Sequence, residues 1–321
     1  MRVAFFIHNP ATNAMAAIVL SWIKQLATQY PDDRYLVLSE SPLSSINESI
    51  PIEQVSIVKV PHRYRLFPFW ADAALYKKLF SFRPNLLVTT YPQQFVFDRW
   101  KPVRVTAEGG LIARGVETSF IPFPTAAYAL LSSEEKHALK EKWSFGREFF
   151  LLVGPLPSEL QLTLLLQAFS IFKHRQQSGL RLILPFSISD HYPTLAKKID
   201  QYKYRNALVI TGSIASVQMA QLAGAAYALV APGPPGSALL AAVQAWQVGV
   251  PLLALTDGGL STVARESVLI AAAPTKEALA AIMMQIYKDE SLRLQLIRSG
   301  QQAWATIDIT AETSKLRTKL Q

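Results

Sequence analysis

The sequence predicts an α/β protein made of two domains, each with a largely parallel sheet. Short apolar runs alternate with amphipathic stretches along the whole chain, which is the pattern of parallel strands joined by helices. The chain has 321 residues, of which 50% are hydrophobic, so it is long enough to form two buried cores. A proline-punctuated, extended segment at 120–127 separates two series of alternating elements.

The first series begins with a buried strand and a long helix whose apolar residues recur at helical spacing. A second, amphipathic helix ends at Arg83-Pro84-Asn85, because a proline cannot continue a helix. The strands expected in this half are 1–8, 34–39, 54–60, 86–90 and 103–107, and the helices are 13–30 and 70–82.

The second series is more regular and begins after Ser132, whose hydroxyl is expected to cap a helix together with Glu134 and Glu135. The expected strands are 149–153, 180–185, 207–211, 228–231, 251–255 and 268–272. The expected helices are 160–174, 192–204, 217–223, 239–248, 276–288, 291–307 and 312–320. We therefore expect Rossmann-like domains at 1–125 and 126–321, with the last helix as a candidate to pack back on the first domain. The cleft between two such domains is the default site.

Composition excludes several classes of protein. The absence of cysteine excludes disulfides and thiolate chemistry, and the histidines lack the spacing of metal ligands, so we expect no metal site. The net charge is +9, but the basic residues are scattered and no nucleic-acid-binding module is recognisable. The apolar run 3–7 is too short for a signal peptide, and prolines and glycines interrupt 227–255, so a cytoplasmic location is expected.

One basic segment, 62–65, precedes the aromatic segment 66–70. This combination suits peripheral contact with a membrane surface, which would put the protein at the inner membrane. A solvated loop that leads into a buried helix explains the same residues, and we favour that interpretation.

Residues 229–255 combine a buried strand, a Pro/Gly turn, a helix and Gly249-Val250-Pro251 before another strand. This order resembles the donor-sugar segment of the retaining glycosyltransferases of family 4, the glycosyl transferases group 1. That family has Pro-Ser after the strand, then two glutamates separated by seven residues, and then Gly-x-Pro. Here Pro232 and Gly233 stand at the Pro-Ser positions, and Gly236 and Gln244 at the glutamates.

Further matches follow in order through the second half. They include Val153-Gly154, Gln167-Ala168-Phe169, Gly212 before a turn, the small residues of 222–227, and the segment 288–293. The resemblance implies the GT-B fold, in which two Rossmann-like domains face each other across a cleft. The first half is shorter than in that family, so we expect a reduced N-terminal domain.

The resemblance also implies a set of donor-binding positions. Family members hold the donor diphosphate with an Arg and a Lys shortly after the Val-Gly strand end, where this chain has Pro155 and Leu160. A glycine at 236 offers only its backbone, whereas Gln244 keeps a neutral hydrogen-bonding group. The donor-binding positions implied are Gly154, Pro155, Leu160, Gly212, Pro232, Gly233, Gly236, Ser237 and Gln244.

Two residues are catalytic candidates. Glu108 stands near the end of an expected strand, where the family has His-Asp, and could supply a carboxylate; a simple turn is the alternative. His8 follows the first strand, where ligands bind in this type of sheet, but a structural histidine fits equally well.

Two functions follow from the resemblance. One is retaining transfer of a hexose from a nucleotide-diphosphate sugar, with no other cofactor, to an unknown acceptor. The other is a catalytically inactive homologue, a pseudoenzyme that acts as a binding or partner subunit for another protein. An epimerase on the same scaffold is a weaker third option without a supporting motif.

Overall fold

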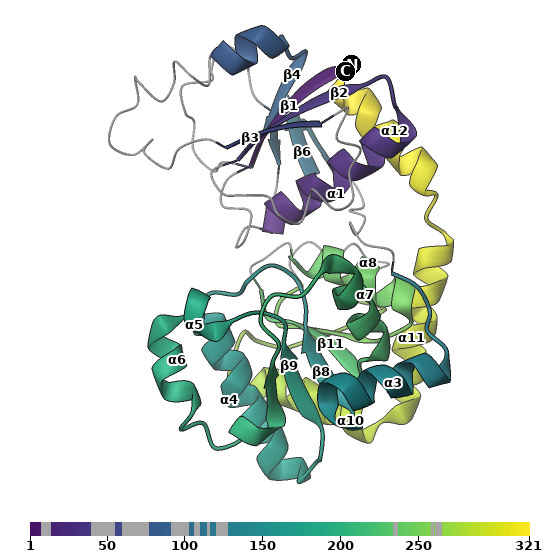
Figure 1. The fold of residues 1–321 in the computed structure, drawn as a ribbon. Coiled ribbons are helices and arrows are strands. Elements are labelled where there is room, and N and C mark those ends of the chain that lie inside the picture. The colour runs from purple at the N-terminus through teal and green to yellow at the C-terminus, as the bar shows by residue number, and fades with distance from the viewer. Residues whose placement is uncertain are drawn as a thin grey trace. The chain divides into compact units, whose positions relative to one another are not determined.

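The structure is a computed structural model that describes residues 1–7, 14–39, 55–59, 77–90, 103–105, 110–113, 116–119, 128–233, 237–257, 260 and 265–321. The chain divides into two compact units. The first consists of Met1–Thr125 together with Asp308–Gln321, and the second of Ala126–Ile307. Residues 308–321, at the end of the expected second domain, thus belong to the first unit by their contacts (Figure 1).

The first unit holds a seven-stranded sheet in the order β3-β2-β1-β4-β5-β6-β7. The first five of these strands are parallel, and β6 and β7 are antiparallel additions at one edge. The strands are β1 (Arg2–Ile7), β2 (Arg34–Ser39), β3 (Val55–Lys59), β4 (Leu86–Thr89), β5 (Val103–Val105), β6 (Gly110–Ala113) and β7 (Val116–Ser119). The β6–β7 hairpin is absent from the sequence prediction, because its two strands are only four residues long and show no clear alternation.

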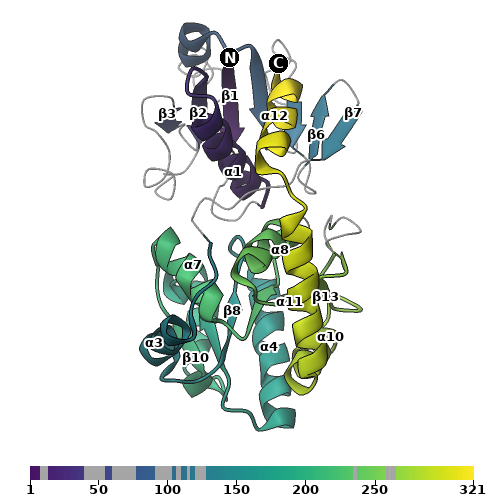
Figure 2. The same ribbon diagram turned by 90° about the vertical axis from the view of Figure 1, so that its right-hand side faces the viewer.

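Both faces of this sheet are covered, so its central strands are apolar along their length. Phe5 packs with Trp22 of α1 (Ala14–Gln29) and with Leu316 of α12 (Ile309–Leu320) on one face. Phe6 packs with Leu79, from the helix 77–82, on the other face. Figure 2 shows α12 lying beside α1 on the first unit.

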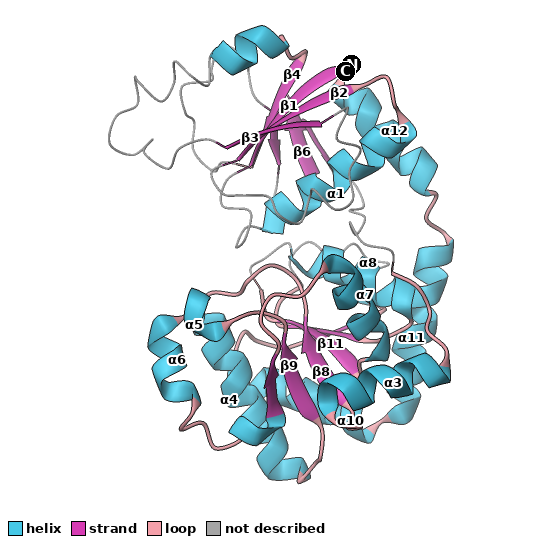
Figure 3. Cartoon of the chain, in the orientation of Figure 1, coloured by secondary structure: helices cyan, strands magenta, loops and turns pink. Residues whose placement is uncertain are grey.

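The second unit holds a six-stranded sheet in which every neighbouring pair is parallel, in the order β10-β9-β8-β11-β12-β13. The strands are β8 (Phe149–Leu152), β9 (Arg181–Leu184), β10 (Leu208–Ile210), β11 (Ala228–Ala231), β12 (Leu252–Ala254) and β13 (Val268–Ile270). Strand and helix alternate through the unit (Figure 3). The two sheets confirm the predicted α/β class.

The described helices of this unit lie where the sequence predicts them, with two differences: the short helix Ile188–His191 is not predicted, and the helix expected at 192–204 is shorter. The helices are α3 (Ser133–Ser144), α4 (Glu159–Gln176), α5 (Ile188–His191), α6 (Pro193–Ile199), α7 (Ser216–Ala225), α8 (Ser237–Val248), α10 (Lys276–Lys288) and α11 (Glu290–Ala305), with a 3-10 turn η3 (Arg205–Ala207). The single helix expected at 192–204 is wrong, because α6 ends at Ile199 and the chain turns. Beyond that turn, the Tyr202 hydroxyl donates to the Leu166 carbonyl of α4 at 2.7 Å.

Capping explains where several helices begin. The Ser132 hydroxyl accepts from the Glu135 N–H at 3.2 Å, and the Glu135 carboxylate accepts from the Ser132 N–H at 2.7 Å. This confirms the predicted cap of α3. Among the described helices, none has the length and apolar character that crossing a membrane requires.

Candidate functional site

The strand order of the second sheet reverses between β8 and β11, so the carboxyl ends of these two strands form the topological switch point of the sheet. In open parallel sheets, the connections from two such strands leave in opposite directions, and ligands bind beyond their carboxyl ends. Val153 and Gly154 follow β8, and the Val153 N–H donates to the Val230 carbonyl at 2.9 Å. Pro232 and Gly233 follow β11. Sequence positions 154 and 232–233, about eighty residues apart, are thus brought to neighbouring strand ends.

Glycine is required at one of these positions. Gly154 has φ of +94°, in the left-handed region that side chains rarely adopt, and it is exposed. It lets the chain leave β8 sharply before α4 begins. Gly212 makes a similar turn after β10 with φ of +72°, and an added Cβ there would meet no atom within 4 Å. The space beside Gly212 is therefore open, and Gly154 is exposed at the end of β8.

Helix α8 begins five residues after Pro232, at Ser237. The first N–H groups of a helix have no partner within it and carry partial positive charge, so they favour an anion. The first turn of α8 has no acidic side chain that would occupy these groups. An anionic ligand at the switch point can accept hydrogen bonds from this helix end.

Gln244 lies two turns further along α8. Its Oε1 atom is buried and has no hydrogen-bond partner among the described residues. Leaving a buried acceptor unpaired destabilises the protein by about 1–3 kcal/mol. A ligand whose hydroxyl donates a hydrogen bond to the Gln244 Oε1 atom would recover that free energy. Gln247, one turn later on the same helix, has an equally unpartnered Oε1.

The β8–α4 connection lacks the cations that would pair with a diphosphate. Pro155 has no N–H, and Leu160 in the first turn of α4 is 77% exposed. The charged side chain in that first turn is the acidic Glu159.

Tyr192 holds this connection in place, because its hydroxyl donates to the Pro157 carbonyl at 2.5 Å. Burial, and then the nearby Glu159 carboxylate, raise the pKa of Tyr192 to about 12. The phenol therefore stays protonated and remains a donor at neutral pH.

The catalytic candidates His8 and Glu108 lie outside the described residues, as does Gly236. Among the described positions, Gly154 and Pro155 follow β8, Pro232 and Gly233 follow the neighbouring β11, and Gly212 follows the edge strand β10. Leu160 and Ser237 lie in the first turns of α4 and α8, and Gln244 lies further along α8.

An ion pair after β12 has no counterpart in the sequence prediction. Arg265 donates to the Asp257 carboxylate, and both side chains are about half exposed. No sequence spacing indicates a pair eight residues apart across a loop.

Within the described ranges, no group of three or more His, Asp or Glu residues could hold a metal ion.

Residues 133–303 match the sequence model of the glycosyl transferases group 1. The chain belongs to this family. The match spans 171 of 321 residues and includes the six strands, the switch point and α8. No curated relative matches the chain significantly.

Solved structures of glycosyltransferases resemble this family member over nearly its whole length. WaaG, a glycosyltransferase involved in lipopolysaccharide biosynthesis, is 12% identical with a TM-score of 0.69, and 99% of each chain is covered. HepE from Anabaena, in a complex with UDP and glucose, is 14% identical with a TM-score of 0.70, covering 100% of this chain and 99% of that one. Sucrose-phosphate synthase from Thermosynechococcus elongatus is 14% identical with a TM-score of 0.66 at the same coverage. These likenesses confirm the predicted GT-B class of fold.

Proposed function

We propose that this protein is a glycosyltransferase that binds a nucleotide-diphosphate sugar at the β8–β11 switch point and transfers a hexose with retention. Family membership supports the reaction class. HepE, a structural relative, is described in complexes with UDP and with UDP-glucose, which supports a nucleotide sugar as the donor. The observation that carries the proposal is the unpartnered Oε1 of Gln244, on the helix that begins at the switch point.

The donor would be held mainly by backbone groups. The N–H groups at the start of α8 would donate to the diphosphate, whose negative charge the helix dipole stabilises. Gln244 would accept a hydrogen bond from a hydroxyl of the donor. Gly154 would let the backbone approach the ligand closely, because it has no side chain.

The reaction itself is group transfer. The bond between the anomeric carbon and the diphosphate oxygen breaks, and the nucleoside diphosphate leaves with the electron pair. A bond forms between the acceptor oxygen and the anomeric carbon, and the acceptor proton passes to a base. His8 and Glu108 are candidates for that base, and positively polarised N–H groups near the leaving diphosphate would lower the barrier.

A second function is favoured by Pro155 and Leu160. Hydrogen bonds from charged groups contribute about 1.5–3 kcal/mol each, so two missing cations weaken diphosphate binding substantially. A chain that kept the scaffold and lost these contacts would serve as an inactive binding or partner subunit. Its exposed Leu160 would then suit a protein contact better than a phosphate contact.

Either function fits a cytoplasmic protein, with the basic-aromatic segment 62–70 as a peripheral contact to the inner membrane. That segment lies outside the described residues. Binding to vesicles that lack the acceptor would test this contact separately from donor binding.

Calorimetric titration with UDP, GDP and their sugars, followed by a donor-hydrolysis assay, separates the two functions. The transferase proposal expects saturable binding and slow release of free sugar in the absence of acceptor. No binding of any of these ligands at saturating concentration would rule it out. Binding without sugar release, together with a stable complex with another transferase, would favour the inactive subunit.

A further inference from the structure

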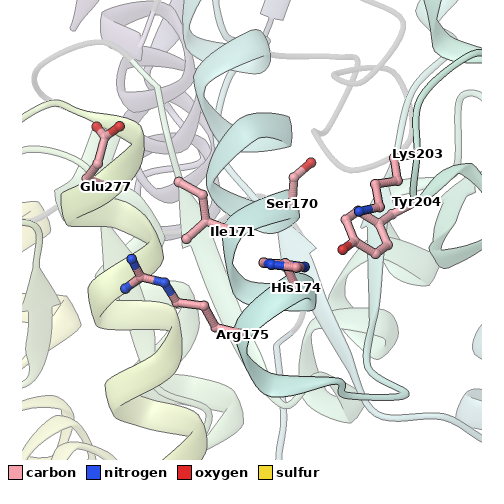
Figure 4. Close-up of a pocket in the computed structure, with 7 residues that line it drawn as sticks. All are labelled: Ser170, Ile171, His174, Arg175, Lys203, Tyr204 and Glu277. Atoms are coloured by element: carbon pink, nitrogen blue, oxygen red, sulfur yellow. The ribbon is translucent and has the colours of Figure 1, made fainter.

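An open pocket lies on the outer surface of α4, away from the switch point. Its volume is about 460 Å³, within the range of small-molecule sites. Its lining comes from α4, α10 and the turn after α6: Ser170, Ile171, His174, Arg175, Lys203, Tyr204 and Glu277. Figure 4 shows Arg175 extending from α4 towards α10, and His174 on the side of Lys203 and Tyr204.

This pocket is separate from the proposed donor site. Helix α4 begins at Glu159, beside the carboxyl end of β8, and His174 lies near its other end. Fifteen residues of helix correspond to about 22 Å at 1.5 Å per residue. A ligand in the pocket would therefore not contact the residues proposed to hold the donor.

The pocket contains two cations without an ion-pair partner among the described residues. Neither Arg175 nor Lys203 forms an ion pair within the part of the chain that the structure describes. The Lys203 ammonium lies 5.5 Å from the centroid of the Tyr204 ring, which orients it beside the pocket. Exposed cations at one concave site favour an anionic ligand.

The segment 173–205, which supplies four of the seven lining residues, strengthens this preference through its net charge. Residues 173–205 contain seven Lys or Arg and only two Asp, a local net charge of +5 in a chain of net charge +9. Such a concentration attracts anions from solution and raises their association rate. It does not by itself select one ligand, so the pocket's other groups decide the ligand's chemistry.

Those other groups are an apolar floor and a carboxylate. Ile171 lies on α4 between the two sides of the pocket, and Glu277 is on the α10 side (Figure 4). Glu277 lies 3.9 Å from Lys276, in an exposed pair of small energetic value, so it remains available as an acceptor. A carboxylate accepts hydrogen bonds from hydroxyls and repels a second phosphate.

We propose that this pocket binds a sugar phosphate. The phosphate lies between Lys203 and His174, the apolar face of the sugar ring covers Ile171, and the sugar hydroxyls donate to Glu277. A membrane surface fits less well, because the site is concave and one wall carries a carboxylate that would face the lipid phosphates.

The test is NMR or calorimetric titration of the full chain with glucose 6-phosphate and with inorganic phosphate. Glucose 6-phosphate is expected to bind saturably and more tightly than inorganic phosphate. Lys203→Gln is expected to weaken both ligands about tenfold, the effect of one charge-assisted hydrogen bond. Glu277→Gln is expected to weaken glucose 6-phosphate but not inorganic phosphate.

Lys198→Gln is the matched control, because Lys198 is exposed on the same basic surface and does not line the pocket. Equal weakening by Lys198→Gln and Lys203→Gln would overturn the proposal, since it would show only general attraction of anions. Absence of glucose 6-phosphate binding at millimolar concentration, or binding no tighter than that of inorganic phosphate, would also overturn it. So would binding to phosphatidylglycerol vesicles without binding of glucose 6-phosphate. Gln244→Leu is expected to leave this binding unchanged, which separates the pocket from the donor site.

Discussion

Arg317 on α12 donates to both carboxylate oxygens of Asp33, at 2.8 and 3.2 Å. The Asp33 side chain is only 2% exposed, and it also accepts from the Met1 ammonium at 2.5 Å and from the Tyr35 hydroxyl at 3.4 Å. The Arg317 guanidinium lies 4.3 Å from the centroid of the Tyr30 ring. Residues from the two ends of the sequence thus form one charged cluster in the first unit.

Removal of the Arg317 charge is expected to destabilise the first unit. Arg317→Gln leaves a buried carboxylate with fewer partners, and breaking such a pair costs about 3–5 kcal/mol when no other cation remains. The Met1 ammonium still pairs with Asp33, so we expect about 2–3 kcal/mol. Hydrogen exchange in β1, β2 and α12 measures the loss. Lys319→Gln, at an exposed position of the same helix, is the control and should change stability by less than about 0.5 kcal/mol.

The same cluster makes the first unit sensitive to acid. Burial raises the pKa of Asp33, but hydrogen bonds from Arg317 and the Met1 ammonium outweigh burial and hold the pKa below its ordinary value. A carboxyl group with a lower pKa in the folded state stabilises the fold fully above its unfolded pKa, and that contribution disappears as pH falls further. Exchange protection in α12 should therefore decrease as pH falls below about 4. Asp33→Asn should lack this step, and an unchanged pH profile in that variant would contradict the assignment.

Gln244→Leu should weaken binding of a nucleotide sugar about tenfold, because a ligand hydroxyl loses its acceptor. The folded protein should be as stable as the wild type or slightly more stable, since an unpartnered buried oxygen is removed. Gln247→Leu is a close control, because it removes a similarly unpartnered oxygen from the same helix. Titration and thermal unfolding of both variants check this. Equal affinities in the two variants would place the donor elsewhere.

Introduction of cations at the β8–α4 connection should strengthen nucleoside diphosphate binding. Leu160→Lys is expected to raise the affinity for UDP about tenfold, the effect of one charge-assisted hydrogen bond. Leu160 is 77% exposed, so the substitution disturbs no packing. Val217→Lys, at an exposed position in the first turn of α7, is the control for added charge. Equal gains in both variants would show that Leu160 is not beside the phosphates.

Gly300→Ala is expected to destabilise the second unit by about 1–3 kcal/mol. An added Cβ at Gly300 would lie 2.5 Å from Cδ1 of Trp246, whose ring nitrogen donates to the Ser267 hydroxyl at 2.8 Å. Gly212→Ala meets no neighbouring atom and should cost only the backbone strain of its positive φ, about 1 kcal/mol. Urea unfolding of the two variants compares a packing cost with a backbone cost.

Most of the second unit could be predicted from the sequence, because its strands are buried on both faces and read as apolar runs between recognisable helix caps. The β6–β7 hairpin of the first unit could not be predicted, because strands of four residues are too short to show a recognisable alternation of apolar and polar residues. The predicted helix 192–204 is too long, because the chain turns after Ile199 and Tyr202 then forms a tertiary hydrogen bond to α4 that the local sequence does not indicate.

The candidate site, too, could be predicted from the sequence only in part. Positions such as Gly154 and Pro232 follow strand ends and could be placed from topology alone. The unpartnered state of Gln244 and the pocket beside α4 depend on side-chain packing between distant segments. No spacing in the sequence reports such packing.

Hydrogen exchange of the full chain with and without UDP-glucose tests the central claim most directly. Donor binding at the β8–β11 switch point predicts slower exchange at 153–156 and in the first two turns of α8, with little change at 170–176. Protection of 170–176 without protection of α8, or no protection at saturating UDP-glucose, would contradict the account.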